Sequence, residues 1–456
     1  MKIRLTLAAA LVAFLVPAST IAQSGVTLIQ RLDSIAGADV LGDRSVGLAV
    51  AVVRGKDALL LKAYGKADFE GAPLTLNTVI PIGSVTKQFT AAAILQLRDA
   101  GKLTLDDEIT KWLPDFETRG ARLTLRHLLG HTAGVVDITR MPELRAVQLM
   151  RNPNVSRDSV YNVVRNYPFE FPAGTMQVYS NTGFWLLGRI VEKASGMTYE
   201  EYLEKRFFAP LGMMHSMHCS KAKDVVDRAS GHGMRNGRTG RVPEIVHTGT
   251  YSAGAICSTA GDMVTWLQAL HGGKVLTPRS YTEMITPTRL NDGTPTRYGM
   301  GLTVLTDSRG LREIGHDGGG FGFSSQAWWH PDSQLAIVLL TNSEPDNTTA
   351  IAEALAVEVL GPARTAAAFS GDASPFIGTY KAQVRGKEMM VAVSQAPEGL
   401  AVSVDGGAVR PLQWVEGWTF RLPMPLLTFR RSGNGGPVSE LRFDTGGDHI
   451  ILKREP

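Results

Sequence analysis

The chain has 456 residues, of which 44% are hydrophobic and 20% are charged, and its formal net charge is +4. This length suits two or three domains, and the composition excludes an intrinsically disordered chain. Charges of both signs are mixed along the sequence without a basic run, so we expect no nucleic acid among its partners.

The first 22 residues have the pattern of a signal peptide. Lys2 and Arg4 precede an apolar segment at 5–16, and Thr20 and Ala22 supply small residues at the cleavage positions. We therefore expect a periplasmic or secreted protein, with an uncleaved membrane anchor as the alternative. No later segment is long and apolar enough to cross a bilayer, so we expect no stable membrane anchor.

Helix and strand patterns alternate up to about residue 360. Apolar residues three and four positions apart predict a helix at 26–35, and two β-rich runs predict strands at 46–53 and 58–64. A helical pattern also runs from about residue 84 to Gly101, a good helix stop. Further helices are predicted at 182–194, 199–207, 260–271 and 348–360, and further strands at 300–305, 323–330 and 335–341.

The predicted strands lie at both ends of the first 360 residues, with helices between them. The simplest arrangement is an antiparallel sheet built from both ends of this region and flanked by its terminal helices. Residues 105–290 would form a mostly helical subdomain, which makes the fold class α+β. An active site is expected where the sheet and the subdomain meet.

The composition changes after residue 361. Residues 362–374 are rich in Ala, Gly and Ser and are typical of a linker. From 375 to 456, about eight short β-like runs are separated by glycine-rich turns, which predicts a small all-β domain of barrel type. We therefore divide the chain into a signal peptide at 1–22, a main domain at 23–361, a linker at 362–374 and a β-domain at 375–456.

Ser84 and Lys87 lie three residues apart at the start of a helical pattern. Residues at this spacing share one face of a helix. A serine hydroxyl is a weak nucleophile that needs a base, and a lysine can serve when burial lowers its pKa. The same spacing recurs at Ser220 and Lys223, but that segment is polar and has no helical pattern after it, so we favour Ser84.

Two further motifs stand near predicted helix or strand starts. Tyr179-Ser180-Asn181 precedes the helix predicted at 182–194. A tyrosine beside a lysine can share its proton, although Ser180 or Asn181 taken alone could be a plain helix N-cap. His316-Asp317-Gly318-Gly319 precedes the strand predicted at 323–330, and its glycines would let a substrate approach the backbone closely.

These motifs follow one another in the order S-x-x-K, Y-x-N and H-x-G. In this order the chain resembles the serine β-lactamase and penicillin-binding-protein superfamily over residues 26–360. The resemblance is to the Y-x-N branch, which holds class C β-lactamases, D-alanyl-D-alanine carboxypeptidases, D-aminopeptidases and family VIII esterases. Residues 81–90, 125–134 and 315–319 are similar to the surroundings of these motifs in the family. The β-domain resembles the lipocalin-like C-terminal domains of some members.

The resemblance implies a serine hydrolase with a β-lactamase-like fold that cleaves an amide, peptide or ester bond through an acyl-enzyme on Ser84. Lys87 and Tyr179 would move the proton of Ser84, and which of them is the general base stays open. The backbone N–H groups of Ser84 and Gly319 would form the oxyanion hole. The residues expected to contact the substrate are Asn181, His316, Asp317 and Gly318. The resemblance implies no cofactor and no metal, and the expected partner is a small-molecule or peptide substrate.

One motif departs from the class C pattern, in which K-T-G occupies the position of His316-Asp317-Gly318. A lysine charge and a hydroxyl suit a substrate carboxylate, whereas a histidine is only partly charged near neutral pH and an aspartate is negative. Repulsion should weaken the binding of β-lactams and of peptide C-termini. We therefore expect esters, amides or peptides with a free amino end as better substrates, with β-lactamase or carboxypeptidase activity as the alternative.

Other interpretations are weaker. A non-catalytic sensor of peptidoglycan or β-lactams would not need a nucleophile. His127 and His131 could share a helix face, but no acidic partner completes a zinc motif, so we expect structural roles for both. Cys257 lies in an apolar run, which favours a buried free thiol over a disulfide with Cys219. The sequence leaves the oligomeric state open.

Overall fold

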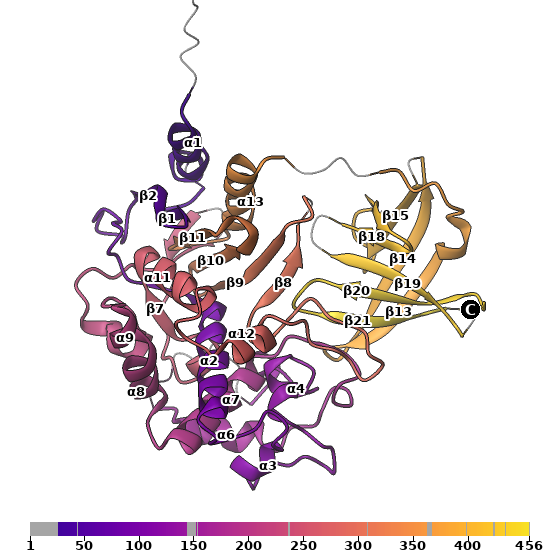
Figure 1. Ribbon diagram of the computed structural model, residues 1–456, viewed down its shortest axis with the longest axis horizontal. Helices are drawn as coiled ribbons and strands as arrows, with labels where there is room; N and C mark the ends of the chain where they lie inside the picture. The colour runs from indigo at the N-terminus through magenta and orange to yellow at the C-terminus, as the bar shows by residue number, and fades with distance from the viewer. Residues whose placement is uncertain are drawn as a thin grey trace, which may run out of the picture.

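The computed structural model describes residues 26–455 apart from 43, 144–151, 153, 236–237, 308, 363–366, 398, 423–424 and 434. The predicted signal peptide at 1–22 and part of the predicted linker, 363–366, lie outside the described residues. Within these, the chain forms an α/β body and a separate all-β body, which Figure 1 shows on the right in yellow. None of the described helices is long and apolar enough to cross a membrane.

The α/β body is built on a six-stranded antiparallel sheet whose strands come from both ends of the region, as the sequence predicted. Its central pairing joins β1 to β11, with Leu48 opposite Thr341 and Arg54 opposite Leu335. Both strands are almost wholly buried, which explains their continuous apolar sequences. In spatial order the strands are β2 (Asp57–Gly65), β1 (Gly47–Arg54), β11 (Leu335–Thr341), β10 (Phe323–His330), β9 (Arg312–Gly320) and β8 (Thr303–Thr306).

Two terminal helices, α1 (Leu28–Leu41) and α13 (Thr348–Leu360), pack together against one face of this sheet (Figure 1). Helix α1 begins with a capping box between Thr27 and Gln30, and Leu32 and Ala36 are fully buried on its inner side. The same core cluster includes residues of β1 and β11, so these two helices close the molecule on the side away from the helical subdomain.

The helical subdomain packs on the opposite face and shares the largest core of the chain with the sheet. The helix predicted at 260–271 is α11, and the one predicted at 182–194 is α7 with one more residue at each end. The helix predicted at 199–207 divides into α8 and a π-helical turn, Glu204–Phe208. The remaining helices of this region also surround the core. The elements are α2 (Thr86–Asp99), α3 (Ile109–Trp112), α4 (Leu125–Leu129), α6 (Arg157–Val164), α7 (Asn181–Ser195), α8 (Tyr199–Leu203), α9 (Ala209–Leu211), α10 (Tyr251–Gly254), α11 (Ala260–His271) and α12 (Pro278–Met284).

Two small sheets lie beside the main one. One has the order β3-β7-β4 and leads the chain towards Ser84, and the other has the order β12-β5-β6. Their strands are β3 (Ile80–Pro81), β4 (Met217–His218), β7 (Ile256–Ser258), β5 (His232–Arg235), β6 (Arg238–Arg241) and β12 (Ser343–Glu344).

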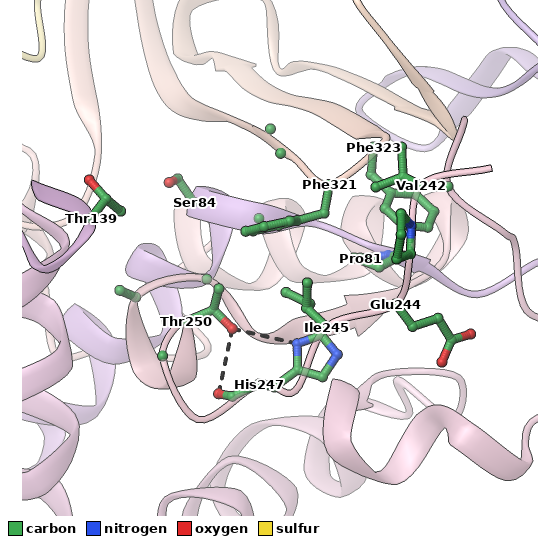
Figure 2. Close-up of a pocket in the computed structure, with 18 of the residues that line it drawn as sticks. Pro81, Ser84, Thr139, Val242, Glu244, Ile245, His247, Thr250, Phe321 and Phe323 are labelled. Atoms are coloured by element: carbon green, nitrogen blue, oxygen red, sulfur yellow. Dashed lines mark hydrogen bonds between the residues drawn. The ribbon is translucent and has the colours of Figure 1, made fainter. Parts of the chain in front are cut away.

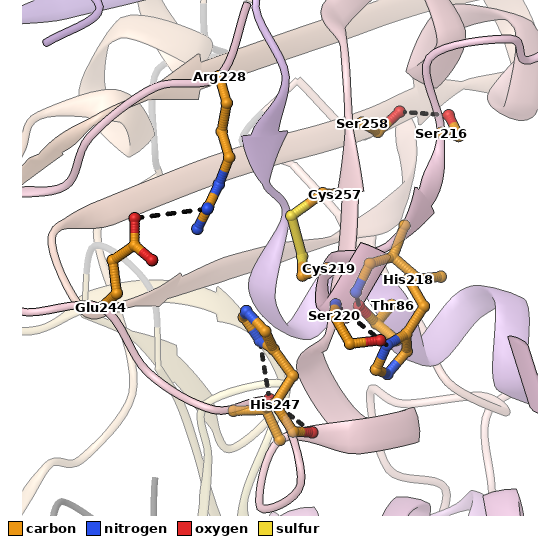
Figure 3. Close-up of a disulfide and its surroundings, with 12 residues drawn as sticks. Thr86, Ser216, His218, Cys219, Ser220, Arg228, Glu244, His247, Cys257 and Ser258 are labelled. Carbon is orange, nitrogen blue, oxygen red and sulfur yellow. Dashed lines mark hydrogen bonds and ion pairs between the residues drawn. A yellow bond between two sulfur atoms is a disulfide. The ribbon is translucent and has the colours of Figure 1, made fainter. Parts of the chain in front are cut away.

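Cys219 and Cys257 form a disulfide in the first of these sheets, so the expectation of a buried free thiol at Cys257 was wrong (Figure 3). Strand β4 pairs with β7, and Met217 lies opposite Cys257. This pairing brings the Cα atoms of the two cysteines to 5.0 Å, within the usual range for a disulfide. The apolar sequence around Cys257 predicts that the residue is buried. It does not distinguish a free thiol from a disulfide, because both can be buried.

The all-β body is a nearly closed, barrel-like antiparallel sheet of nine strands, which confirms the predicted fold. It has its own core, in which Phe376, Tyr380 and Phe429 are buried. In spatial order its strands are β16 (Arg410–Pro411), β15 (Gly399–Val404), β14 (Lys387–Ala396), β13 (Gly378–Val384), β21 (His449–Arg454), β20 (Val438–Asp444), β19 (Leu426–Arg431), β18 (Thr419–Arg421) and β17 (Gln413–Glu416).

Candidate active site

Ser84 lies in a 3-10 turn, Gly83–Val85, between the end of β3 and the start of α2. Gly83 has a φ of +50°, which only glycine adopts readily. A Cβ atom at Gly83 would also lie 2.9 Å from the backbone nitrogen of Gly319. The glycine therefore lets the turn approach β9 closely and places Ser84 between the first turn of α2 and this strand.

Lys87 points from α2 back towards Ser84 and is completely buried. Its Nζ atom lies 3.0 Å from Ser84 Oγ, 2.9 Å from Asn181 Oδ1 and 2.8 Å from the carbonyl oxygen of Ala253. Burial lowers the pKa of Lys87 to about 7, against the charges of Asp137 and Asp317, which raise it. The neutral form of Lys87 is therefore well populated near physiological pH, beside the charged form.

Asn181 is held in place by a residue that the sequence motifs did not include. The carboxylate of Asp137 accepts hydrogen bonds from the backbone nitrogen of Asn181 at 2.6 Å and from its Nδ2 at 3.2 Å. These contacts fix the amide so that its Oδ1 atom faces Lys87. Asn181 is the first residue of α7, and Ser180 at the N-cap makes no side-chain capping bond, so the motif is not a plain N-cap.

Tyr179 lies beside Lys87, with its ring centroid 4.7 Å from Lys87 Nζ. Its hydroxyl is buried and makes no well-formed hydrogen bond with the described residues. Burial raises the pKa of Tyr179 well above its usual value, and the neighbouring Ser84 hydroxyl opposes this rise. The ring of His131 packs 4.3 Å from the tyrosine ring, and His131 Nδ1 accepts a hydrogen bond from the Ser180 backbone nitrogen. His131 thus has a structural place beside the site.

The third motif lies within β9, whereas the sequence predicted no strand there. Strand β8 pairs with Arg312–Gly315, and among the described residues no strand pairs with 316–320 on that side. A Cβ atom at Gly318 would lie 2.8 Å from the backbone nitrogen of Ser84. The backbone of this edge therefore contacts the turn that carries Ser84, as an oxyanion hole formed by Ser84 and Gly319 would require.

His316 is almost fully buried, and both of its ring nitrogens are engaged within the protein. Nδ1 lies 2.5 Å from the Asp317 carbonyl oxygen and Nε2 lies 3.0 Å from the Tyr298 hydroxyl. Because a carbonyl only accepts, Nδ1 carries the proton and Nε2 accepts from Tyr298. Burial lowers the pKa of His316 below its usual range. The side chain is therefore neutral, whereas the sequence led us to expect a partial charge.

The Asp317 side chain is 67% exposed, and its Oδ1 atom lies 3.8 Å from His316 Nδ1. Its charge acts on the buried groups of the site, since it raises the pKa of both Lys87 and Tyr179. The side of the site next to His316 thus carries a carboxylate and no positive charge from the motif, where a class C enzyme would have a lysine.

A pocket of about 390 Å³ opens from Ser84 on the side away from His316 (Figure 2). Ser84 stands at one end, and the ring of Phe321 reaches towards it from the turn after β9. Asn181 lines the pocket, and Tyr179 does not. Its larger apolar side chains come from several elements and are Pro81, Ile138, Val242, Ile245, Phe321 and Phe323.

The structure thus brings Ser84, Lys87, Tyr179 and Asn181 together, with Gly318 and Gly319 against the serine turn. The sequence analysis missed Asp137, Tyr298 and the Ala253 carbonyl. Asp137 does begin a local capping pattern, because its side chain accepts from the Thr139 backbone nitrogen. Nothing local links it to Asn181, which is 44 positions away.

Comparisons with known proteins show which family and which proteins this chain is similar to. The family model described as Beta-lactamase matches residues 32–361. Penicillin-binding protein 4* of Bacillus subtilis (strain 168) is 30% identical over 312 residues, which cover 65% of this chain and 68% of that protein. D-aminopeptidase of Brucella anthropi is 29% identical over 304 residues, which cover 65% of this chain and 56% of that protein.

A solved structure of D-amino acid amidase from Ochrobactrum anthropi SV3, complexed with L-phenylalanine, is 26% identical with a TM-score of 0.63. It covers 73% of this chain, and this chain covers 98% of it.

Proposed function

The chain belongs to the beta-lactamase family and is a serine hydrolase, and from this premise we propose that it cleaves D-amino-acid amides or short peptides with a free amino end. The observation that carries the proposal is the contact of Lys87 Nζ with Ser84 Oγ beside the motif His316-Asp317-Gly318, whose histidine is neutral and which therefore supplies no cation. Relatives named as a D-aminopeptidase and a D-amino acid amidase support this substrate class.

We assign the role of general base to Lys87. A neutral amine has two N–H groups and one lone pair. The N–H groups can donate to Asn181 Oδ1 and to the Ala253 carbonyl, so the lone pair is left to accept the Ser84 proton. Tyr179 keeps its proton at neutral pH because its pKa is raised well above the usual value. It can pass this proton to the leaving group as the acyl-enzyme forms, and the proton that Lys87 takes from Ser84 then restores it, so that both residues end in their starting states.

The charges around the site favour an uncharged leaving group. Tyr179 and Asp317 interact electrostatically, so a leaving group protonated by Tyr179 departs close to the Asp317 carboxylate. A carboxylate on the leaving group would be repelled there, and neutral His316 offers no compensating charge. Ammonia, an amine or an alcohol meets no such penalty, and a peptide escapes it when its carboxylate lies beyond the first residue of the leaving group, so a dipeptide should be a poorer substrate.

The acyl part of the substrate would occupy the pocket beyond Ser84. Ser84 and Asn181 line this pocket, so we place the acyl group there and the leaving group towards Tyr179. Phe321 and Ile245 give the pocket apolar walls, which suit an apolar side chain of an amino acid.

We further propose that the protein works in an oxidising compartment, either the periplasm or the medium. The disulfide between Cys219 and Cys257 supports this location, because such bonds persist where thiols are not kept reduced. The signal-peptide pattern at 1–22 points the same way.

A substrate panel tests the proposed activity. D-phenylalanine amide, its L isomer, N-acetyl-D-phenylalanine amide and an N-acylated D-alanyl-D-alanine would be compared by kcat/KM, with Ser84→Ala as the control. We expect the D-amide with a free amino group to exceed each of the others by about 10-fold or more. A preference for the D-alanyl-D-alanine substrate would contradict the proposal and favour a carboxypeptidase.

A further inference from the structure

The barrel-like body reaches the catalytic site through one turn. This turn, residues 444–449, joins β20 to β21 and lies against the segment that precedes Tyr179. Gln177 and His449 exchange two backbone hydrogen bonds, of 3.2 and 2.8 Å. The buried Gln177 side chain also donates from Nε2 to the carbonyl oxygens of Gly446 at 3.1 Å and Gly447 at 2.6 Å.

Asp448 contacts the catalytic tyrosine itself. Its Oδ1 atom accepts a hydrogen bond of 2.8 Å from the backbone nitrogen of Tyr179. Gly447 lies against the tyrosine side chain, since a Cβ atom there would be 3.7 Å from Tyr179 Cδ2. The Asp448 side chain is only 14% exposed, so these contacts are sheltered from water.

The 444–449 turn is held rigid by its own contacts. Asp444 accepts from the Gly446 backbone nitrogen at 2.7 Å and pairs with His449 Nδ1 at 2.8 Å. Arg385, from the hairpin between β13 and β14, donates to the same Oδ1 atom of Asp448 at 2.8 Å. Contacts within the barrel-like body therefore hold the Asp448 side chain in the place where it binds Tyr179.

We propose that Asp448 is a positioning residue that sets the place of Tyr179, so that the barrel-like body completes the catalytic site. The inference rests on the proposed role of Tyr179 as proton donor to the leaving group. A displaced tyrosine would transfer its proton less well, and misplacement by about 1 Å can cost on the order of 100-fold in rate.

The matched control lies at the same boundary. Asp292 pairs with Arg442 of the barrel-like body at 2.6 Å, and within the described part of the chain the hydrogen-bond partner of the Tyr179 backbone nitrogen is Asp448 and not this pair. Asp292→Ala would therefore weaken the boundary without removing the Asp448 contact. Asp448→Ala removes the acceptor, whereas Asp448→Asn keeps an oxygen that can accept from Tyr179.

The first readout is the dependence of rate on the leaving group. The variants would be assayed with acetate esters of p-nitrophenol, phenol and ethanol, whose leaving groups need a proton to an increasing degree. We expect Asp448→Ala to lower kcat for ethyl acetate by about 10- to 100-fold and for p-nitrophenyl acetate by less than about 3-fold, with KM little changed. Asp448→Asn should recover most of this loss, and Asp292→Ala should affect the three esters equally. An equal loss for all esters in Asp448→Ala would overturn the proposal.

The second readout needs no substrate. Hydrogen exchange in the peptide that contains 177–181 should become about 10-fold faster in Asp448→Ala, and stay unchanged in Asp448→Asn and Asp292→Ala. Unchanged exchange in Asp448→Ala would overturn the positioning role. If exchange is faster in Asp448→Ala but the wild-type protein hydrolyses none of the esters, the positioning contact is retained and the hydrolytic role of Tyr179 is refuted.

The groups whose charges act on Tyr179 are Asp137, Asp317 and Asp448. Its neighbours Lys87, His131 and His316 are also titratable.

Discussion

The Nζ atom of Lys87 lies 3.0 Å from the Oγ atom of Ser84, and its other two hydrogen-bond partners are the Asn181 side chain and the Ala253 carbonyl. Both of those partners only accept from the lysine. The third contact is therefore the one through which a neutral lysine can take up a proton. This relationship distinguishes a base from a lysine that merely fills a buried position.

Replacement of Lys87 should abolish turnover with the fold intact. Lys87→Met removes the base and should lower kcat for p-nitrophenyl acetate by about 10²- to 10⁴-fold. Lys87→Arg should be about as inactive, because a guanidinium does not deprotonate. The exposed Lys102→Met is the control and should keep full activity. An active Lys87→Arg variant would exclude the lysine as base.

The activity should rise with pH through about 7. Lys87 acts in its neutral form, which is populated above its pKa of about 7 and lost as the pH falls below it. The charge of Asp317 raises this pKa, so Asp317→Asn should move the rising limb of kcat/KM to lower pH. Profiles between about pH 5 and 9 would measure both effects. A limb that shifts to higher pH in Asp317→Asn would contradict the assignment.

The carboxylate of Asp317 should hinder β-lactams. Asp317→Thr removes the negative charge and supplies a hydroxyl, so acylation of Ser84 by benzylpenicillin should become about 5-fold faster or more, since one charge contact is worth about 1 kcal/mol or more. Intact mass against time would record the adduct, with Ser84→Ala as the blank. If the rate does not increase, the exposed Asp317 carboxylate does not meet the penicillin carboxylate.

The disulfide should contribute measurably to stability. Cys219 and Cys257 are 38 positions apart, and a loop of this length predicts a loss of about 3 to 4 kcal/mol in the free energy of unfolding when both are replaced by Ala. Urea unfolding of the double variant, with and without reductant, would measure the loss. Reductant should lower the stability of the wild type alone, and a wild type that does not respond to it would show that the bond does not form.

Much of the site was predictable because its signals are local. Ser84 and Lys87 share one helix face through a spacing of three residues, and Gly83 before them permits the tight turn. The strands at 323–330 and 335–341 were predicted with the bounds that the structure has, since their buried pattern lies within each segment. A helix period or a strand composition is a property of neighbours in the chain, so the sequence alone determines it.

Only the tertiary structure decided the charge states of the site residues and the contacts that hold them in place. The neutrality of His316 depends on Tyr298 and on burial, the orientation of Asn181 depends on Asp137, and the setting of Tyr179 depends on Asp448. The pairing of the two cysteines depends on the register of β4 against β7. Each of these relationships joins segments that are distant in the chain or arises from desolvation, and both effects exist only after the chain has packed.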